Sequence, residues 1–208
     1  MTARRASAGP GTIRYHLQRA IELDPEFAEP LYHLARHHLR HGRRQAGLTH
    51  LQRAAEVAIR SSEASARLAA ECSEKHNFAA AKGYMQEALH LRRLACRASH
   101  RSGLVYLEEG AGAEARAAFA RAVEYNPDHA EASYQLGRLL LQEGDPLAAR
   151  PYLEQAVEND FTLAAAHLAL ARAITAEEEF DLARNHYWTA LDLDFSLADQ
   201  ELDGKFGS

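Results

Sequence analysis

Apolar residues recur along this chain with two periods at once. At short range they return every three to four residues, which is typical of amphipathic helices, and no stretch alternates in the manner of a strand. At long range, small residues return every 34 positions in five windows that begin at residues 28, 62, 96, 130 and 164. The eighth, twentieth and twenty-seventh positions of these windows are always Ala or Gly: Ala35, Ala69, Gly103, Gly137 and Ala171; Gly47, Ala81, Ala115, Ala149 and Ala183; Ala54, Ala88, Ala122, Ala156 and Ala190. A period of this length predicts a stack of helical units that contact only their neighbours.

Each window is expected to form two helices, over positions 1–14 and 18–31. A small residue at positions 8 and 20 would let the two backbones approach closely, and one at position 27 would let the second helix pack on the next unit. Larger apolar residues at positions 7 and 24 are expected to fill the core around them. These are Leu34, Leu68, Leu136 and Leu170, with Ser102 as the exception, and Leu51, Met85, Phe119, Leu153 and Tyr187.

The turn signals agree with this division of the chain. Gly42, Gly110 and Gly144 fall at position 15, where a glycine can adopt the left-handed conformation that ends a helix. Asp24-Pro25 and Asn126-Pro127 mark junctions between successive units.

The pattern resembles the tetratricopeptide repeat family, whose signature spans 34 residues. The best match is the window from Ala130 to Leu163, and the preceding window adds further signature residues. The matching residues are Leu136, Gly137, Gly144, Asp145, Ala149, Leu153 and Ala156, then Gly103, Tyr106, Ala115, Phe119, Ala122 and Pro127. The family's Trp at position 4 is missing from every window, and its Pro at position 32 appears only as Pro25 and Pro127.

The resemblance covers residues 12–197 and implies an all-α, right-handed solenoid of helix-turn-helix units. Five repeats are expected, at 28–61, 62–95, 96–129, 130–163 and 164–197. Residues 12–27 resemble the second half of a further repeat, which would follow a flexible leader at residues 1–11. Residues 198–208 are expected to form a short cap or tail. The chain could also be the repeat domain of a larger enzyme or regulatory protein.

Net charge differs sharply between the two halves of the chain. Residues 1–104 hold 17 Arg or Lys and 9 Asp or Glu, a net charge of +8, whereas residues 105–208 hold 7 and 20, a net charge of −13. Such asymmetry favours an interaction partner or head-to-tail self-association. A drift of surface charge without function remains the alternative.

No apolar run approaches the length of a membrane span, and the N-terminus lacks the apolar segment of a secretory signal. Cys72 and Cys96 are too far apart for a metal-binding pair and are interpreted as buried small residues in a reducing compartment. We therefore expect a cytoplasmic protein without membrane insertion.

In the tetratricopeptide family the first helix of each repeat lines a concave groove. The resemblance therefore implies a non-catalytic adaptor or scaffold that binds a protein or peptide segment with acidic groups, because arginine donates to carboxylates and tyrosine adds contact area. The alternative is that the arginines pair with glutamates of the same chain, such as Glu63, Glu71 or Glu131. The expected groove residues are Tyr32, Arg36, Arg67, Arg97, His100, Arg101, Tyr134, Arg138 and Arg172.

Some family members bind acidic chaperone tails through a clamp of five positions, which here hold Tyr32, Arg36, Arg67, Arg97 and Arg101. Only Arg97 and Arg101 match that clamp in kind, so a chaperone partner is not expected.

Other functional classes have weaker signals. His33, His37 and His41 share a helical spacing that can bind a metal, but no further ligand completes a recognisable set, and surface or packing roles are favoured. A basic stretch at residues 91–101 is a candidate RNA contact, which the acidic C-terminal half disfavours. No catalytic or phosphate-binding motif is present, so we expect neither an enzyme nor a cofactor.

Overall fold

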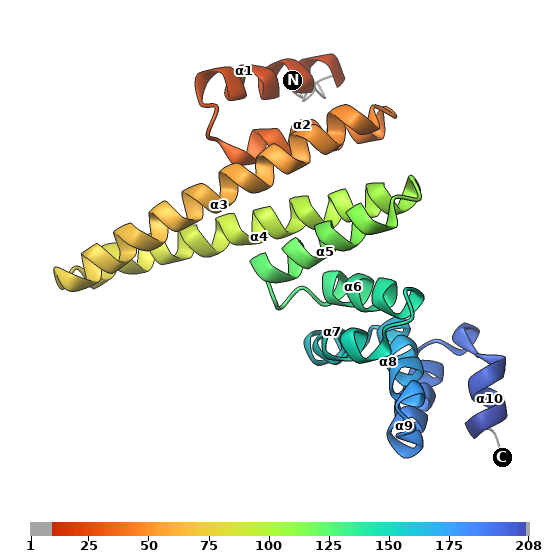
Figure 1. The fold of residues 1–208 in the computed structure, drawn as a ribbon. Coiled ribbons are helices and arrows are strands. Elements are labelled where there is room, and N and C mark those ends of the chain that lie inside the picture. Colours follow the sequence, from red (N-terminus) through yellow and green to blue (C-terminus); the bar gives the residue numbers. More distant parts are fainter. Residues whose placement is uncertain (1–9, 207–208) are drawn as a thin grey trace, which may run out of the picture. The chain divides into compact units, whose positions relative to one another are not determined.

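A computed structural model describes residues 10–206, and within that range the chain is all-α, with no strand. Figure 1 shows the helices following one another along the chain. They are α1 (Pro10–Leu23), α2 (Ala28–Arg40), α3 (Arg44–Glu74), α4 (Phe78–Glu108), α5 (Gly112–Tyr125), α6 (Ala130–Gln142), α7 (Pro146–Asn159), α8 (Ala164–Ala176), α9 (Phe180–Leu193), the 3-10 helix η1 (Phe195–Leu197) and α10 (Gln200–Phe206). The all-α fold class is confirmed.

The chain divides into two compact units, Met1–Val105 and Tyr106–Ser208. In the N-terminal unit α1 contacts α2, and α2 contacts α3. In the C-terminal unit each helix from α5 to α9 contacts the next in sequence. The boundary between the units coincides with the change in net charge, so the first unit is basic and the second is acidic. Sequential pairing of neighbours is the packing that the 34-residue period predicts.

The periodic small residues lie in the interior, as predicted. All fifteen Ala and Gly residues at positions 8, 20 and 27 are buried. At Gly137, a Cβ atom would come within 2.6 Å of Leu153 Cγ, and at Gly47 it would come within 2.6 Å of Leu39 Cγ. These distances are far below van der Waals contact. The helices α6 and α7, and likewise α2 and α3, can therefore approach this closely only because glycine has no side chain at these positions.

The residue type at position 31 of each window determines whether the second helix of that window ends there. Where that residue is Asp or Asn, it is the C-cap directly after the helix: Asn126 follows α5, Asp160 follows α7 and Asp194 follows α9. These three residues adopt nearly the same extended conformation, with φ between −151° and −144° and ψ between 92° and 96°. The Oδ1 atoms of Asp160 and Asp194 accept backbone N–H groups two residues on, an Asx turn that competes with the helix.

The predicted helix breaks near residues 59–61 and 93–95 are wrong. Position 31 holds Ala58 and Arg92 in these windows, and no Gly, Pro, Asn or Asp follows at once. Both residues are good helix formers that offer the backbone no alternative partner. The helices therefore run on, and α3 and α4 reach 31 residues each, whereas α5 to α9 have 13 or 14. The repeat boundaries themselves remain a prediction.

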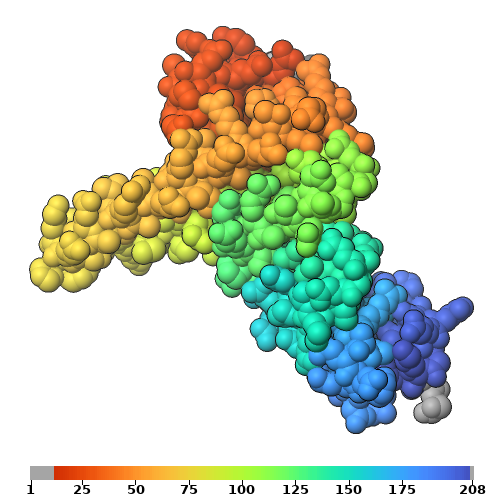
Figure 2. Space-filling view, in the orientation of Figure 1, coloured from red at the N-terminus to blue at the C-terminus, as the bar shows by residue number. Residues whose placement is uncertain are grey.

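The continuous helices make a hairpin of α3 and α4 whose far part, residues 62–90, projects from α2. Figure 1 shows the two helices side by side, and Figure 2 shows the projection as a narrow yellow arm. Small residues line the contact within it, where Ser62 Oγ donates to the carbonyl oxygen of Ala88 at 3.0 Å. The larger apolar residues point outward instead.

Two predicted core residues are therefore on the surface. Leu68 and Met85 hold positions 7 and 24, but 41% and 48% of their surfaces are exposed. Their counterparts in the other windows, such as Leu34, Leu51 and Leu136, are almost completely buried. The reason is the length of α3 and α4, which carries these residues past the neighbouring helix that would cover them.

The turn within each repeat has one conformation in all five windows. Position 15 has a positive φ at Gly42, Gly110 and Gly144, as predicted, with values from 71° to 82°. The same position is occupied by His76 (φ 57°) and Glu178 (φ 63°), the two non-glycine residues with positive φ in the described part of the chain. The turn geometry thus persists where the favourable residue is absent, at a cost in conformational energy.

The predicted cap at residues 198–208 contains a short helix. Leu202 and Phe206 of α10 are buried against the C-terminal unit. The predicted leader, residues 1–11, lies almost entirely outside the described residues, and α1 already includes residues 10 and 11.

Candidate functional site

A cluster of one tyrosine and two arginines lies between α2 and α4. Tyr32 is almost completely buried, and Arg36 follows it by one turn of α2. The guanidinium carbon of Arg36 lies 5.8 Å from the centre of the Tyr32 ring, and that of Arg97, on α4, lies 5.4 Å from it. Both distances are typical of cation–π contacts. The structure thus brings together three residues that the sequence predicts for the groove.

The two arginines of this N-terminal cluster lack carboxylate partners among the residues described. The buried Nε of Arg36 has no hydrogen-bond partner in that range. Two cations share one ring, and a guanidinium has five N–H donors to satisfy. The cluster is therefore suited to an anion that arrives from outside, since a carboxylate or phosphate would satisfy both charge and donors.

The other predicted residues of the N-terminal unit surround this cluster less closely. His100 and Arg101 follow Arg97 within about one turn of α4, and both are half-buried. Arg67 is exposed on the projecting part of α3. No ion pair or ring contact in the described range joins Arg67 to Tyr32.

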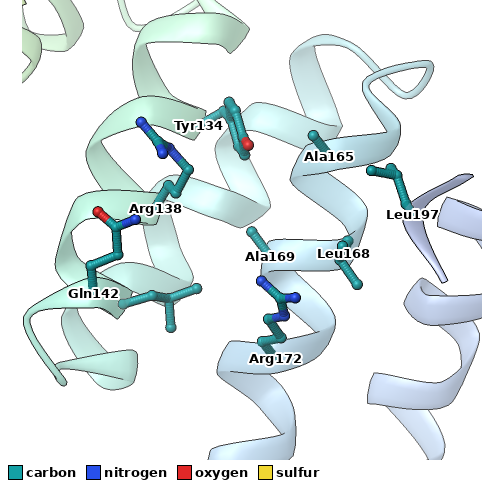
Figure 3. Close-up of a pocket in the computed structure, with 9 residues that line it drawn as sticks. Tyr134, Arg138, Gln142, Ala165, Leu168, Ala169, Arg172 and Leu197 are labelled. Atoms are coloured by element: carbon teal, nitrogen blue, oxygen red, sulfur yellow. The ribbon is translucent and has the colours of Figure 1, made fainter. Parts of the chain in front are cut away.

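The C-terminal unit has a pocket of about 430 Å³ between α6 and α8. Tyr134 and Arg138 line it from α6, and Arg172 lines it from α8, so the structure again brings three predicted residues together. Figure 3 shows the side chains of the two helices facing each other across the pocket, with Leu197 beside α8. Leu168 and Ala169 add an apolar floor. Burial raises the pKa of Tyr134, so its hydroxyl stays protonated at neutral pH.

The arginines of the C-terminal pocket are held by other groups of the chain. Arg138 donates through Nε and Nη2 to Gln135 Oε1 at 3.1 and 2.7 Å, and Gln135 donates in turn to Glu131. Arg172 donates to Asp199 Oδ2 through Nε at 2.9 Å and through Nη2 at 2.6 Å. The alternative of internal pairing thus holds for Arg172, but its partner is an aspartate beyond the last repeat and not one of the expected glutamates.

Leu197 and Asp199 are residues of this site that the sequence did not predict. The groove positions come from the first helix of each 34-residue window, and both residues lie outside those helices. Burial raises the pKa of the Asp199 carboxyl, but hydrogen bonds from Arg172 and from the backbone N–H groups of Leu202 and Glu201 outweigh it and leave the pKa lowered. Asp199 is therefore ionised at neutral pH.

Of the three histidines with metal-type spacing, His37 and His41 pair with each other, whereas His33 contacts the Tyr32 ring. The rings of His37 and His41 lie 4.3 Å apart, and His38 stacks on His50 at 5.3 Å. Within the described range no group of three or more His, Cys, Asp or Glu side chains is arranged to hold a metal ion. Cys96 is buried, which raises its pKa to about 12.

No helix within residues 10–206 combines the length and the apolar character that a bilayer crossing requires.

Comparison with known proteins agrees with the repeat pattern. The family model described as tetratricopeptide repeat matches residues 101–160 and 134–194. The chain is a tetratricopeptide repeat protein. Two solved structures of MamA share its fold, each at 16% sequence identity. One covers 90% of this chain and 90% of its own, with a TM-score of 0.59; the other covers 96% and 87%, with a TM-score of 0.57.

No curated protein sequence gives a significant match. Tetratricopeptide repeats are modules for protein–protein interaction and are typically not catalytic, so the coarse function of this chain is that of an interaction scaffold.

Proposed function

We propose that this protein is an adaptor that binds a peptide segment with acidic groups through its tyrosine–arginine clusters. The observation that carries this proposal is the N-terminal cluster, in which Arg36 and Arg97 approach one tyrosine ring without a carboxylate among the described residues. A carboxylate placed there accepts charge-assisted hydrogen bonds from a partly desolvated site, where they are stronger than in water.

The remaining predicted residues extend this surface. Arg67, His100 and Arg101 add positive or polar groups in the N-terminal unit, whose net charge is +8. Tyr134, Arg138 and Arg172 form the second site, in the C-terminal unit. The basic unit attracts acidic segments at a distance, and the clusters then hold them.

The test is binding of a library of acidic and neutral peptides, measured by fluorescence anisotropy at about 25 mM and about 300 mM salt. Arg36→Glu with Arg97→Glu should weaken the binding of acidic peptides by about 10- to 100-fold, since two charge-assisted contacts become repulsive. Binding by the unchanged protein should also weaken as salt rises.

A matched control separates the cluster from the charge of the unit as a whole. Arg40→Glu with Arg93→Glu makes the same charge change at exposed positions of the same two helices. We expect less than a threefold change for this control, because these arginines lie outside the cluster. An equal loss in both double variants, or affinity that does not vary with salt, would refute the proposed groove chemistry.

A second candidate function is self-association, which the exposed apolar residues of the projecting hairpin favour. Leu68, Phe78, Met85 and Leu89 all expose more than two fifths of their surfaces there. Exposed apolar surface of this kind often marks an interaction site. The opposite net charges of the two units add an attraction between copies.

Light scattering at high concentration and low salt tests this candidate. Leu68→Glu with Met85→Glu should shift the protein towards monomer, whereas Ser73→Glu with Gln86→Glu, at exposed polar positions of the same hairpin, should not. A monomer before any substitution would remove self-association.

A further inference from the structure

The segment that follows α9 is folded onto the C-terminal pocket. Its residues run from Asp194 to Phe206 and include four acidic side chains and one lysine. Tyr187 on α9 anchors it: its hydroxyl accepts the backbone N–H of Asp199 at 2.9 Å and donates to Asp203 Oδ1 at 2.5 Å. Leu202 and Phe206 complete the attachment by burial.

Asp199 makes two separate sets of contacts. Its Oδ1 accepts the N–H groups of Glu201 at 3.0 Å and Leu202 at 3.4 Å, which caps the start of α10. Its Oδ2 accepts both hydrogen bonds from Arg172. Capping needs an oxygen but no charge, whereas the contact with Arg172 is an ion pair. The ion pair with Arg172 is therefore not needed for capping α10.

Leu197 reaches the same pocket two residues earlier. It lines the cavity together with Tyr134, Arg138 and Arg172. Residues 197–199 thus present an apolar side chain to the pocket and a carboxylate to its arginine. A peptide that binds this pocket would make the same two contacts, with an apolar side chain against the apolar floor and a carboxylate against the arginine.

Solvent reaches the contact between residues 197–199 and the pocket from the side of Arg172. The side chain of Arg172 is 55% exposed, whereas that of Asp199 is 13% exposed, so water competes for the guanidinium more than for the carboxylate. A second cavity of about 230 Å³ lies between Arg172, Thr175 and the segment residues Asp199, Glu201, Leu202 and Lys205. The segment therefore does not close tightly over α8.

We propose that residues 197–199 are a built-in ligand of the C-terminal pocket, which a partner segment with the pattern leucine–any residue–aspartate displaces. This inference rests on the proposed function and specifies its ligand: an apolar side chain for the pocket and, two residues later, a carboxylate for Arg172. The free pocket is then only a fraction of the population, and the apparent affinity for a partner is reduced by that fraction.

A labelled peptide with the sequence of residues 194–206 is the probe, and fluorescence anisotropy with the full chain is the measurement. Asp199→Asn in the protein keeps an oxygen for the cap but removes the charge, so the pocket opens while α10 can remain folded. The probe should bind this variant about tenfold more tightly than the unchanged protein. Tyr187→Phe removes the anchoring hydroxyl and should give a smaller gain.

Changes within the probe and the pocket establish where it binds. In the Asp199→Asn protein, adding Arg172→Gln should abolish binding. A probe that carries Leu197→Ser or Asp199→Asn should bind at least tenfold more weakly than the unchanged probe. Circular dichroism of each protein variant checks that its helices are intact.

Equal affinity for the unchanged and the Asp199→Asn proteins would overturn the proposal, as would binding that does not depend on Arg172. Absence of binding to every variant would show that the segment is only a cap. The peptide library and the Arg36 and Arg97 variants test the proposed function at the other unit, so the two ideas can fail separately.

Discussion

The two units carry the same pair of residues in different electrostatic settings. Tyr32 and Arg36 occupy positions 5 and 9 of one repeat, and Tyr134 and Arg138 occupy the same positions three repeats later. In the N-terminal unit the third member, Arg97, has no carboxylate partner within the described range. In the C-terminal unit the third member, Arg172, is held by Asp199.

The units also differ in how their helices are made. The C-terminal unit ends its helices at Asn126, Asp160 and Asp194, whereas the N-terminal unit continues through Ala58 and Arg92. The residue type at position 31 of the 34-residue window thus determines whether short helices stack on one another or two long helices form a projecting hairpin. Periodic small residues determine how closely helices pack, while single residues outside that pattern determine how long a helix is and which charges are left unpaired.

The largest expected effect comes from a break in the continuous helix. Ile59→Pro introduces into α3 the residue that follows the helix end in the matching windows, where Pro25 and Pro127 stand. A proline inside a helix removes one hydrogen bond and clashes with the preceding turn, so we expect a loss of about 3 kcal/mol in the free energy of unfolding. Urea unfolding followed by circular dichroism measures it.

The matched change is Pro127→Ala, at a position outside any helix, for which we expect a loss below about 1 kcal/mol. If Ile59→Pro cost no more stability than Pro127→Ala, a continuous helix at residue 59 would not be required. The proposed difference in helix length between the two units would then be refuted.

A smaller effect concerns a partly buried histidine pair of the C-terminal unit. His167 and His186 face each other with their Nδ1 atoms 3.1 Å apart, and His167 Nε2 lies 3.1 Å from the carbonyl oxygen of Phe161. A carbonyl can only accept, so Nε2 of neutral His167 carries the proton, and His186 must donate through Nδ1. Burial lowers the pKa of both residues from the ordinary value of 6.5.

Because the folded pKa lies below the unfolded one, the unfolded chain binds more protons as pH falls through 6.5, and stability is lost in that direction. Protonation would leave two N–H donors facing each other, at a cost of about 1–3 kcal/mol. Thermal unfolding should therefore show lower stability at about pH 5 than at about pH 7.5.

His186→Asn keeps a donor without the titration and should flatten this dependence, whereas His16→Asn, on the exposed surface of α1, should not. The N-terminal unit has its own stack of His38 on His50, with the pKa of both lowered by burial. A pH profile unchanged by His186→Asn would assign the effect to that unit instead.

The smallest expected effect concerns the turn that both units share. Glu178 has φ 63° at the position where three other repeats have glycine. Glu178→Gly should raise the free energy of unfolding by about 1 kcal/mol, since glycine adopts this conformation without strain. His76→Gly tests the same point in the N-terminal unit.

Glu158→Gly, on an exposed face of α7, is the control of opposite sign and should lower stability by about 1 kcal/mol. A loss of stability in Glu178→Gly would mean that the turn does not strain its residue.

Much of the fold could be predicted from the sequence because the packing signal is repeated. All fifteen small positions are buried, and the glycine turns have the expected conformation. The predicted helix breaks near residues 59–61 and 93–95 are wrong because these two windows lack the Asp or Asn at position 31 that ends the helix in the other windows. The prediction that Leu68 and Met85 are buried is wrong for the same reason, since a repeat pattern contains no information about which helix packs beside each position.

The candidate site also contains residues that could be predicted from the sequence and one that could not. Tyr32, Arg36 and Arg97 were predicted from their repeat positions, and the structure brings them together; the same holds for Tyr134, Arg138 and Arg172. Asp199 could not be predicted, because a residue outside the repeats has no register that relates it to Arg172.

By itself the sequence determined the repeat architecture and the side chains that each helix offers, since both follow from local periodicity and from residues three or four positions apart. Only the tertiary structure decided which arginines are already paired and which apolar residues remain uncovered. The pairing of Arg172 depends on Asp199, 27 positions away, and the exposure of Leu68 and Met85 depends on which helices pack beside them. A local pattern contains no information about such contacts.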